Sequence, residues 1–155
     1  MENYSGGYEN VAREIRTYQD TLNKKEAKKF KLDLLLRVAR RVDEFSAYCG
    51  ECQTLKQEIT MLVAELGNLI HLPNKEARRK YTKAINSMVK HLQKQHKLIT
   101  EGHNMGVWIG IGMAIGVGIG TALGNPGIGP AIGIAIGVAI GSYLDRKAKQ
   151  EGKVI

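Results

Sequence analysis

A stretch of 40 residues without a charged side chain, residues 105–144, constrains the fold of this chain more than any other feature. Glycine or alanine alternates along it with large or β-branched residues. As β-strands, this pattern would give a flat sheet with one small face and one bulky face. As α-helices, it places glycines four residues apart, which lets two helix backbones approach closely in lipid.

Length and hydrogen bonding favour the helical interpretation. The first arm, residues 106–124, has 19 residues, whereas a spanning helix needs about 20 and a spanning strand about 9–11. Two strands in hydrocarbon would also leave unpaired edges. Residues 124–127 suit a helix end followed by a chain break, so we expect a helical hairpin. The second arm, residues 130–144, is short at 15 residues, and tilt, local bilayer thinning or a partly re-entrant arm remains open.

Two faces of small residues run along each predicted helix. One face would pack the two helices together, and the other, about 200° round the helix, would be free to meet another copy of the chain. Homo-oligomerisation is therefore expected. The glycines predicted to pack the helices are Gly112, Gly116, Gly120, Gly124, Gly129, Gly133, Gly137 and Gly141.

The glycine-spaced run over residues 112–141, closed by the basic sequence at residues 144–149, resembles the bacterial glycine-zipper family of small membrane proteins. The resemblance covers roughly the last third of the chain. It implies close helix packing within a membrane. It implies no activity, because that family has none in common.

Charge predicts the orientation of the hairpin. Residues 1–104 carry 19 Lys and Arg against 13 Asp and Glu, and residues 145–155 carry 4 against 2. Positive flanks stay in the cytoplasm, so a multi-pass inner-membrane protein with both termini cytoplasmic is expected. The start of the chain is polar and shows no signal peptide, so the first spanning helix would act as its own insertion signal.

The remaining pattern predicts an all-α chain, with a cytoplasmic helical bundle before the transmembrane hairpin. A step in the heptad count after Cys52, beside Gly50, predicts a bend in a long middle helix. Asn74 is a plausible N-cap for the helix that follows. The expected helices are 8–22, 25–72 and 75–100, and the expected domains are a disordered start 1–7, a helical domain 8–103, the hairpin 104–144 and a basic tail 145–155.

The segment 24–41 is strongly basic, with 8 Lys and Arg against 2 acidic residues. It could lie flat on an anionic membrane surface, or pack on the first helix with its charges in water. Nucleic-acid binding is the weaker alternative, since neither a known module nor interleaved aromatics are present, and no nucleic-acid partner is expected. The residues assigned to a membrane surface are Lys24, Lys25, Lys28, Lys29, Lys31, Arg37, Arg40 and Arg41.

The pair Cys49 and Cys52, in a CxxC spacing, is the clearest chemical feature. Folding the chain back at residue 73 places His96 opposite both cysteines, which suggests a zinc site completed by water or by a second chain. His91 lies about 140° round the helix from His96 and is therefore expected to be a poor fourth ligand. A redox pair and simple core packing remain the alternatives.

No catalytic triad, paired carboxylates or phosphate-binding loop can be placed, so an enzyme is not expected. The leading hypothesis is a membrane-anchored helical protein that self-associates through its glycine-rich hairpin and acts as a scaffold or recruits other components. One alternative is an oligomeric pore or membrane-permeabilising protein. Another is a cytoplasmic metal or thiol sensor that acts through Cys49 and Cys52.

Overall fold

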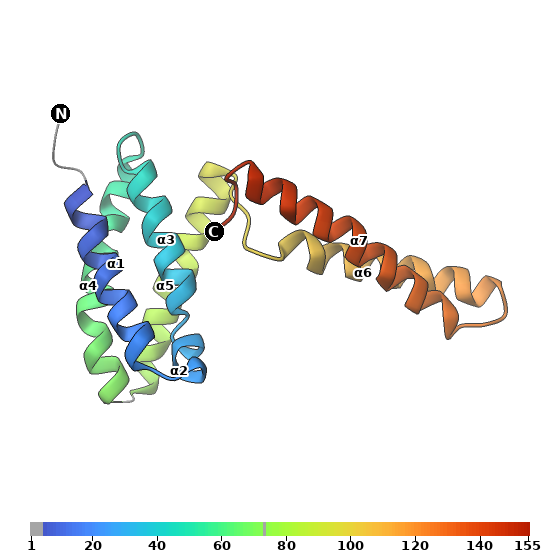
Figure 1. The fold of residues 1–155 in the computed structure, drawn as a ribbon, viewed down its shortest axis with the longest axis horizontal. Coiled ribbons are helices and arrows are strands. Elements are labelled where there is room, and N and C mark those ends of the chain that lie inside the picture. Colours follow the sequence, from blue (N-terminus) through green and yellow to red (C-terminus); the bar gives the residue numbers. More distant parts are fainter. Residues whose placement is uncertain (1–4, 73) are drawn as a thin grey trace. The chain divides into compact units, whose positions relative to one another are not determined.

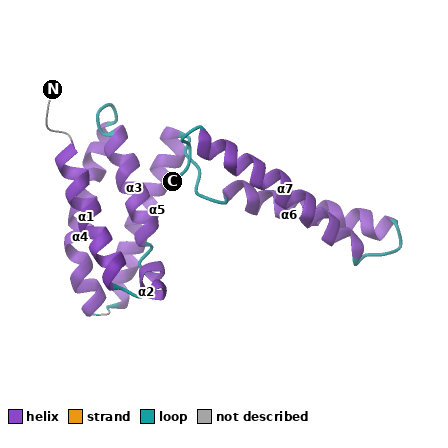
Figure 2. Ribbon diagram, in the orientation of Figure 1, coloured by secondary structure: helices purple, strands orange, loops and turns teal. Residues whose placement is uncertain are grey.

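The computed structural model describes residues 5–72 and 74–155, and these residues form seven helices and no strand (Figures 1 and 2). The all-α prediction is therefore confirmed. The chain divides into two compact units, a helical unit that ends at His96 and a hairpin unit, Lys97–Ile155. The helices are α1 (Ser5–Thr21), α2 (Lys24–Lys29), α3 (Leu32–Phe45), α4 (Gly50–His71), α5 (Lys75–His96), α6 (His103–Ala122) and α7 (Ile128–Gln150).

Within the helical unit, α3 is the central element, because it contacts α1, α2, α4 and α5 (Figure 1). Apolar side chains at helical spacing fill the space between these helices, and their burial is the main force that holds the unit together. Asn74 caps α5 as predicted: its side-chain oxygen accepts hydrogen bonds from the N–H groups of Glu76 and Ala77. Fully buried members of this core are Ile15, Leu35, Val42, Leu66 and Met88.

The prediction of one continuous helix over residues 25–72 is wrong, because α2, α3 and α4 share that range. The first break falls at Lys31, which takes a left-handed conformation with φ 52°. There the hydroxyl of Tyr81 donates a hydrogen bond of 2.9 Å to the buried carbonyl of Phe30. The second break follows Phe45, whose carbonyl accepts the N–H of Cys49 at 2.9 Å, and it lies beside the bend that the heptad slip predicted.

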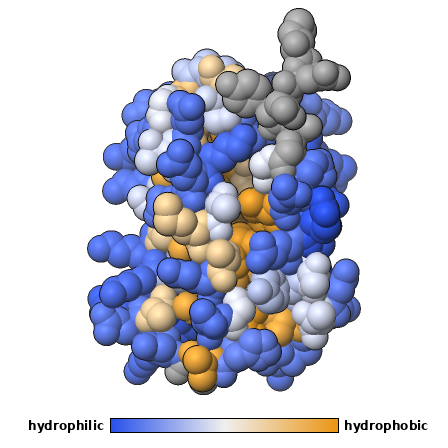
Figure 3. Space-filling model, turned by 90° about the vertical axis from the view of Figure 1, so that its left-hand side faces the viewer, coloured by the Kyte–Doolittle hydropathy of each residue, from blue (hydrophilic) through white to orange (hydrophobic). Residues whose placement is uncertain are grey.

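Part of the apolar side of the basic segment is buried. Phe30, Leu35 and Val38 pack inside the helical unit. Leu34 and Leu36 are half-buried, and the assignment of this segment to a membrane surface stays a prediction. Among the basic residues assigned to a membrane surface, Arg40 and Arg41 both pair with Glu44, and the lysines of α2 are exposed. Figure 3 shows one face of the molecule, where hydrophilic residues lie on both sides of a narrower band of hydrophobic ones.

In the hairpin unit, α6 and α7 pack through their main chains. The buried residues of the two helices are all glycines: Gly112, Gly116 and Gly120 in α6, and Gly129, Gly133, Gly137 and Gly141 in α7. A methyl group on Gly116 would overlap the carbonyl oxygen of Gly129, and one on Gly112 would overlap that of Gly133. Most of the large side chains point outward instead, and six isoleucines are 41–59% exposed: Ile111, Ile115, Ile119, Ile128, Ile132 and Ile136.

Gly124 has the helix-ending role predicted for residues 124–127, but not the packing role that the glycine spacing assigned to it. It lies beyond the end of α6 with φ +71°, and a methyl group built on it would meet nothing within 4 Å. Its N–H donates to the carbonyl of Thr121 at 3.1 Å, and that of Asn125 donates to the carbonyl of Gly120 at 2.9 Å, the two hydrogen bonds of a Schellman cap. The packing assignment of Gly124 is therefore wrong, and its role is to end the helix.

Two sets of hydrogen bonds join the two chain segments at the end of the hairpin opposite its turn. Asp145, on α7, accepts hydrogen bonds of 3.1 Å from the N–H groups of Asn104 and Met105, which begin α6. The N–H of Ile155 donates to the carbonyl of Ile99 at 2.9 Å, and these segments form an isolated parallel bridge. Helix α5 ends at His96 rather than near residue 100, because the next residue, Lys97, takes a left-handed conformation with φ 56°. Residues 145–150 continue α7.

Tyr81→Phe should lower the free energy of unfolding of the helical unit by about 1–3 kcal/mol, because the buried Phe30 carbonyl loses its hydrogen-bond donor. Burial raises the pKa of Tyr81 above the ordinary value. The folded protein therefore keeps this proton while the unfolded chain loses it, and the stability of the wild type should fall as pH rises above about 10. Urea unfolding in mild detergent, followed by circular dichroism from pH 7 to 11, measures both effects.

The matched control for this test is Tyr48→Phe, since Tyr48 belongs to the same unit but is 72% exposed. It should leave both the stability and its pH dependence unchanged. Identical curves for wild type and Tyr81→Phe at every pH would contradict the role given to this hydroxyl.

Gly116→Ala should destabilise the hairpin, whereas Gly118→Ala should not. At Gly116 the added methyl group overlaps the backbone of Gly129, which should cost about 1–3 kcal/mol. At Gly118 it meets nothing within 4 Å, so only the gain in helix propensity remains, up to about 1 kcal/mol. Thermal unfolding in detergent micelles, followed by circular dichroism, should rank Gly118→Ala at or above wild type and Gly116→Ala below it. A loss of similar size in both variants would refute this packing.

Candidate metal centre

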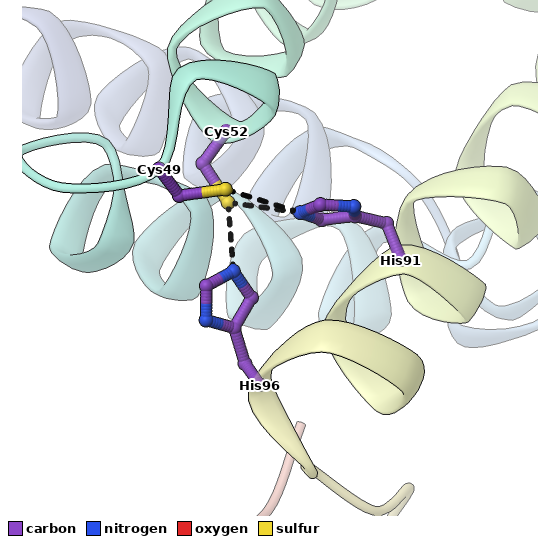
Figure 4. A group of neighbouring side chains, drawn as sticks. All are labelled: Cys49, Cys52, His91 and His96. Carbon is purple, nitrogen blue, oxygen red and sulfur yellow. Dashed lines mark hydrogen bonds between the residues drawn. The ribbon is translucent and has the colours of Figure 1, made fainter.

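The start of α4 and the end of α5 bring four potential metal ligands together. Cys49 is the N-cap of α4, and Cys52 lies in its first turn. His91 and His96 lie in the last two turns of α5. The chain reverses between α4 and α5, so the start of α4 lies next to the end of α5. Figure 4 shows the two thiols and the two imidazoles pointing toward one another.

The ligand atoms are closely spaced. The Nε2 atom of His91 lies 3.5 Å from the Sγ of Cys49 and 3.3 Å from the Sγ of Cys52. The Nε2 atom of His96 lies 3.3 Å from the Sγ of Cys52. All four atoms lie within 4.8 Å of one another, so the cluster could hold a metal ion.

These separations fit the dimensions of a zinc site. With Zn–S bonds of about 2.3 Å and Zn–N bonds of about 2.0–2.1 Å, a tetrahedral centre places neighbouring ligand atoms about 3.3–3.8 Å apart. Three of the four sulfur–nitrogen pairs have distances within this range. The donor set also fits, since two thiolates and two imidazoles in a tetrahedron are typical of zinc.

The surroundings orient both imidazole rings. The Nδ1 atom of His91 lies 3.0 Å from a carboxylate oxygen of Glu51, and the His91 side chain is only 5% exposed. The ring of His96 stacks on the ring of Phe45, with centroids 3.9 Å apart and planes inclined by 10°. Both histidines therefore present Nε2 to the cysteines.

Burial keeps the Cys52 thiol protonated in the metal-free protein. It is the main cause that raises the pKa of Cys52 to about 12, and a hydrogen bond with Cys49 and the negative charges of Cys49 and Glu51 add to it. Desolvation and the neighbouring His91 lower the pKa of His96, which keeps that imidazole neutral, the form that binds metals.

The sequence prediction found three of the four residues. Cys49, Cys52 and His96 are brought together as expected, but the exclusion of His91 was wrong. The angle between two helix positions describes where the Cα–Cβ bonds point, whereas a metal is bound by ring nitrogens several bonds further out. The H-x4-H spacing that accompanies the CxxC was the available signal, since paired histidines three to five residues apart are common in zinc sites.

No known protein family, curated protein or solved structure matches this chain. Its function is therefore inferred from the geometry of its own residues, and the glycine-zipper resemblance stays a prediction from the sequence pattern.

Purified full-length protein, kept reduced in mild detergent, should carry about one zinc ion per chain, because one chain supplies all four ligands. Cys52→Ser and His91→Ala should each reduce the bound zinc to near zero after gel filtration, measured by elemental mass spectrometry. His71→Ala is the matched control, because this exposed histidine ends α4, away from the cluster. Full zinc content in His91→Ala would contradict the assignment of the fourth ligand.

Proposed function

We propose that this chain is a non-enzymatic, membrane-anchored helical protein whose helical unit holds a structural zinc ion. The observation that carries the proposal is the convergence of four ligand atoms, from Cys49, Cys52, His91 and His96, within 4.8 Å. Four protein ligands close the coordination shell of zinc and leave no position for water or substrate. A closed shell is typical of structural sites and not of catalytic ones.

The metal would brace the helical unit at one end. The chain joins α4 to α5 at one end of their hairpin, and the zinc ion would join the first turn of α4 to the last turn of α5 at the other. Binding energy of this kind contributes directly to folding, because the ligands are not held together in the unfolded chain.

The exposed apolar side chains support a membrane anchor. Helices α6 and α7, with 20 and 23 residues, are long and apolar enough to cross a bilayer. Their isoleucines point away from the glycine contact, so the hairpin shows its large apolar groups to its surroundings. Such a surface is costly in water and suited to hydrocarbon. The basic flanks favour an inner membrane with both termini in the cytoplasm, where the two thiols would stay reduced.

An anchored helical unit without a reaction centre fits a scaffold or recruitment role better than the two alternatives. Against a pore, neither helix carries a polar stripe that could line one, because Thr121, Asn125 and Ser142 are the only small polar side chains within residues 106–144. Against a sensor that exchanges metal readily, Cys52 is fully buried and the shell is closed. The outward small residues, among them Gly110 and Gly118, are the surface through which copies of the hairpin would associate.

Full-length protein should stay with membranes through an alkaline carbonate wash, be released by mild detergent and carry zinc when released. A strong chelator should then lower its thermal midpoint by several degrees, because the bound metal stabilises the folded state. The same chelator applied to washed membranes should not release the protein, since the anchor is separate from the zinc ligands. Recovery of the protein in the carbonate supernatant would refute the membrane anchor. A thermal midpoint that the chelator does not change would refute the structural zinc ion.

A further inference from the structure

We infer that Glu51 is a positioning residue of the zinc centre: its carboxylate holds the proton of His91 on Nδ1, which leaves Nε2 free to bind Zn²⁺. The inference rests on the proposed function and adds to it a residue that binds no metal itself. Glu51 stands inside the CxxC sequence, between the two cysteine ligands.

The contact defines which imidazole nitrogen carries the proton. A carboxylate oxygen of Glu51 lies 3.0 Å from Nδ1 of His91. An ionised carboxylate can only accept, so a hydrogen bond across this distance requires the proton to be on Nδ1. In the neutral ring the other nitrogen then has its lone pair free, and this is the Nε2 atom that lies 3.3 Å from the Sγ of Cys52.

The two histidines are held by different means. Stacking on Phe45 holds the plane of the His96 ring, but stacking does not choose between its two nitrogens. His91 is held through a polar contact that chooses between them. A free neutral imidazole can place its proton on either nitrogen, and a proton on Nε2 would block the metal. Removing the carboxylate should therefore weaken zinc binding through His91.

Glu51 could matter for another reason, because it lies in the first turn of α4, where a negative charge stabilises a helix. The two roles predict different results for Glu51→Gln. The amide oxygen of glutamine can still accept a hydrogen bond from Nδ1, but it has no charge. If only the charge matters, Glu51→Gln and Glu51→Ala should lose the same amount of zinc affinity.

The test measures the Zn²⁺ affinity of full-length protein in detergent by competition with a chromophoric chelator. Glu51→Ala should bind zinc about 10–100-fold more weakly than wild type, as is typical when the partner of a metal-binding histidine is removed. Glu51→Gln should fall between the two. Glu58→Ala, an exposed carboxylate on the same helix, is the matched control and should bind like wild type.

Nitrogen-15 NMR of the His91 ring in zinc-free protein supplies a second measurement, the position of the ring proton, which a change in helix stability alone would not alter. Wild type should show the proton on Nδ1, and Glu51→Ala should shift the population toward Nε2. Wild-type affinity in Glu51→Ala, or equal losses in Glu51→Ala and Glu51→Gln, would overturn the inference while leaving the zinc centre in place. If wild type itself binds no zinc, the proposed function fails, and this positioning role fails with it.

Discussion

Two helix ends meet at the open end of the α4–α5 hairpin, and the atoms that meet there are poor partners for one another without a cation. A protonated thiol is a weak hydrogen-bond donor, yet the Nε2 atom of His91 lies within 3.5 Å of both sulfurs. A divalent ion that replaces the thiol protons would turn these weak contacts into four metal–ligand bonds. The high pKa of Cys52 describes the protein without that ion, because burial then opposes the bare thiolate.

The hairpin unit depends on a different constraint, the close contact of two main chains. Glycines are the buried residues of α6 and α7, and the large side chains surround them. This arrangement reverses the usual order of a water-soluble helix pair, where large apolar groups lie inside. The cap that Asp145 provides to the start of α6 then fixes the open end of the same contact.

Much of the hairpin could be predicted from the sequence, because glycine spacing is a local pattern with a direct geometric meaning. Seven of the eight glycines assigned to the contact are buried there, and Gly124 differs because the helix ends before it. The breaks in the middle helix were harder to predict. The one at Lys31 accompanies a hydrogen bond from Tyr81, which lies 51 residues away from Phe30 along the chain. His91 was missed because a helical wheel gives the direction of each Cα–Cβ bond and not the position that a ring nitrogen can reach.

The glycine contact has a consequence for how the sequence can vary. At the most exposed isoleucines of α6 and α7, such as Ile115 and Ile132, one apolar side chain can replace another, since more than half of the residue surface faces outward. At Gly112, Gly116, Gly129 and Gly133 even the smallest addition overlaps a backbone atom of the opposite helix. Tolerance to mutation along this hairpin is therefore greatest where the side chains are largest, and least where there is no side chain at all.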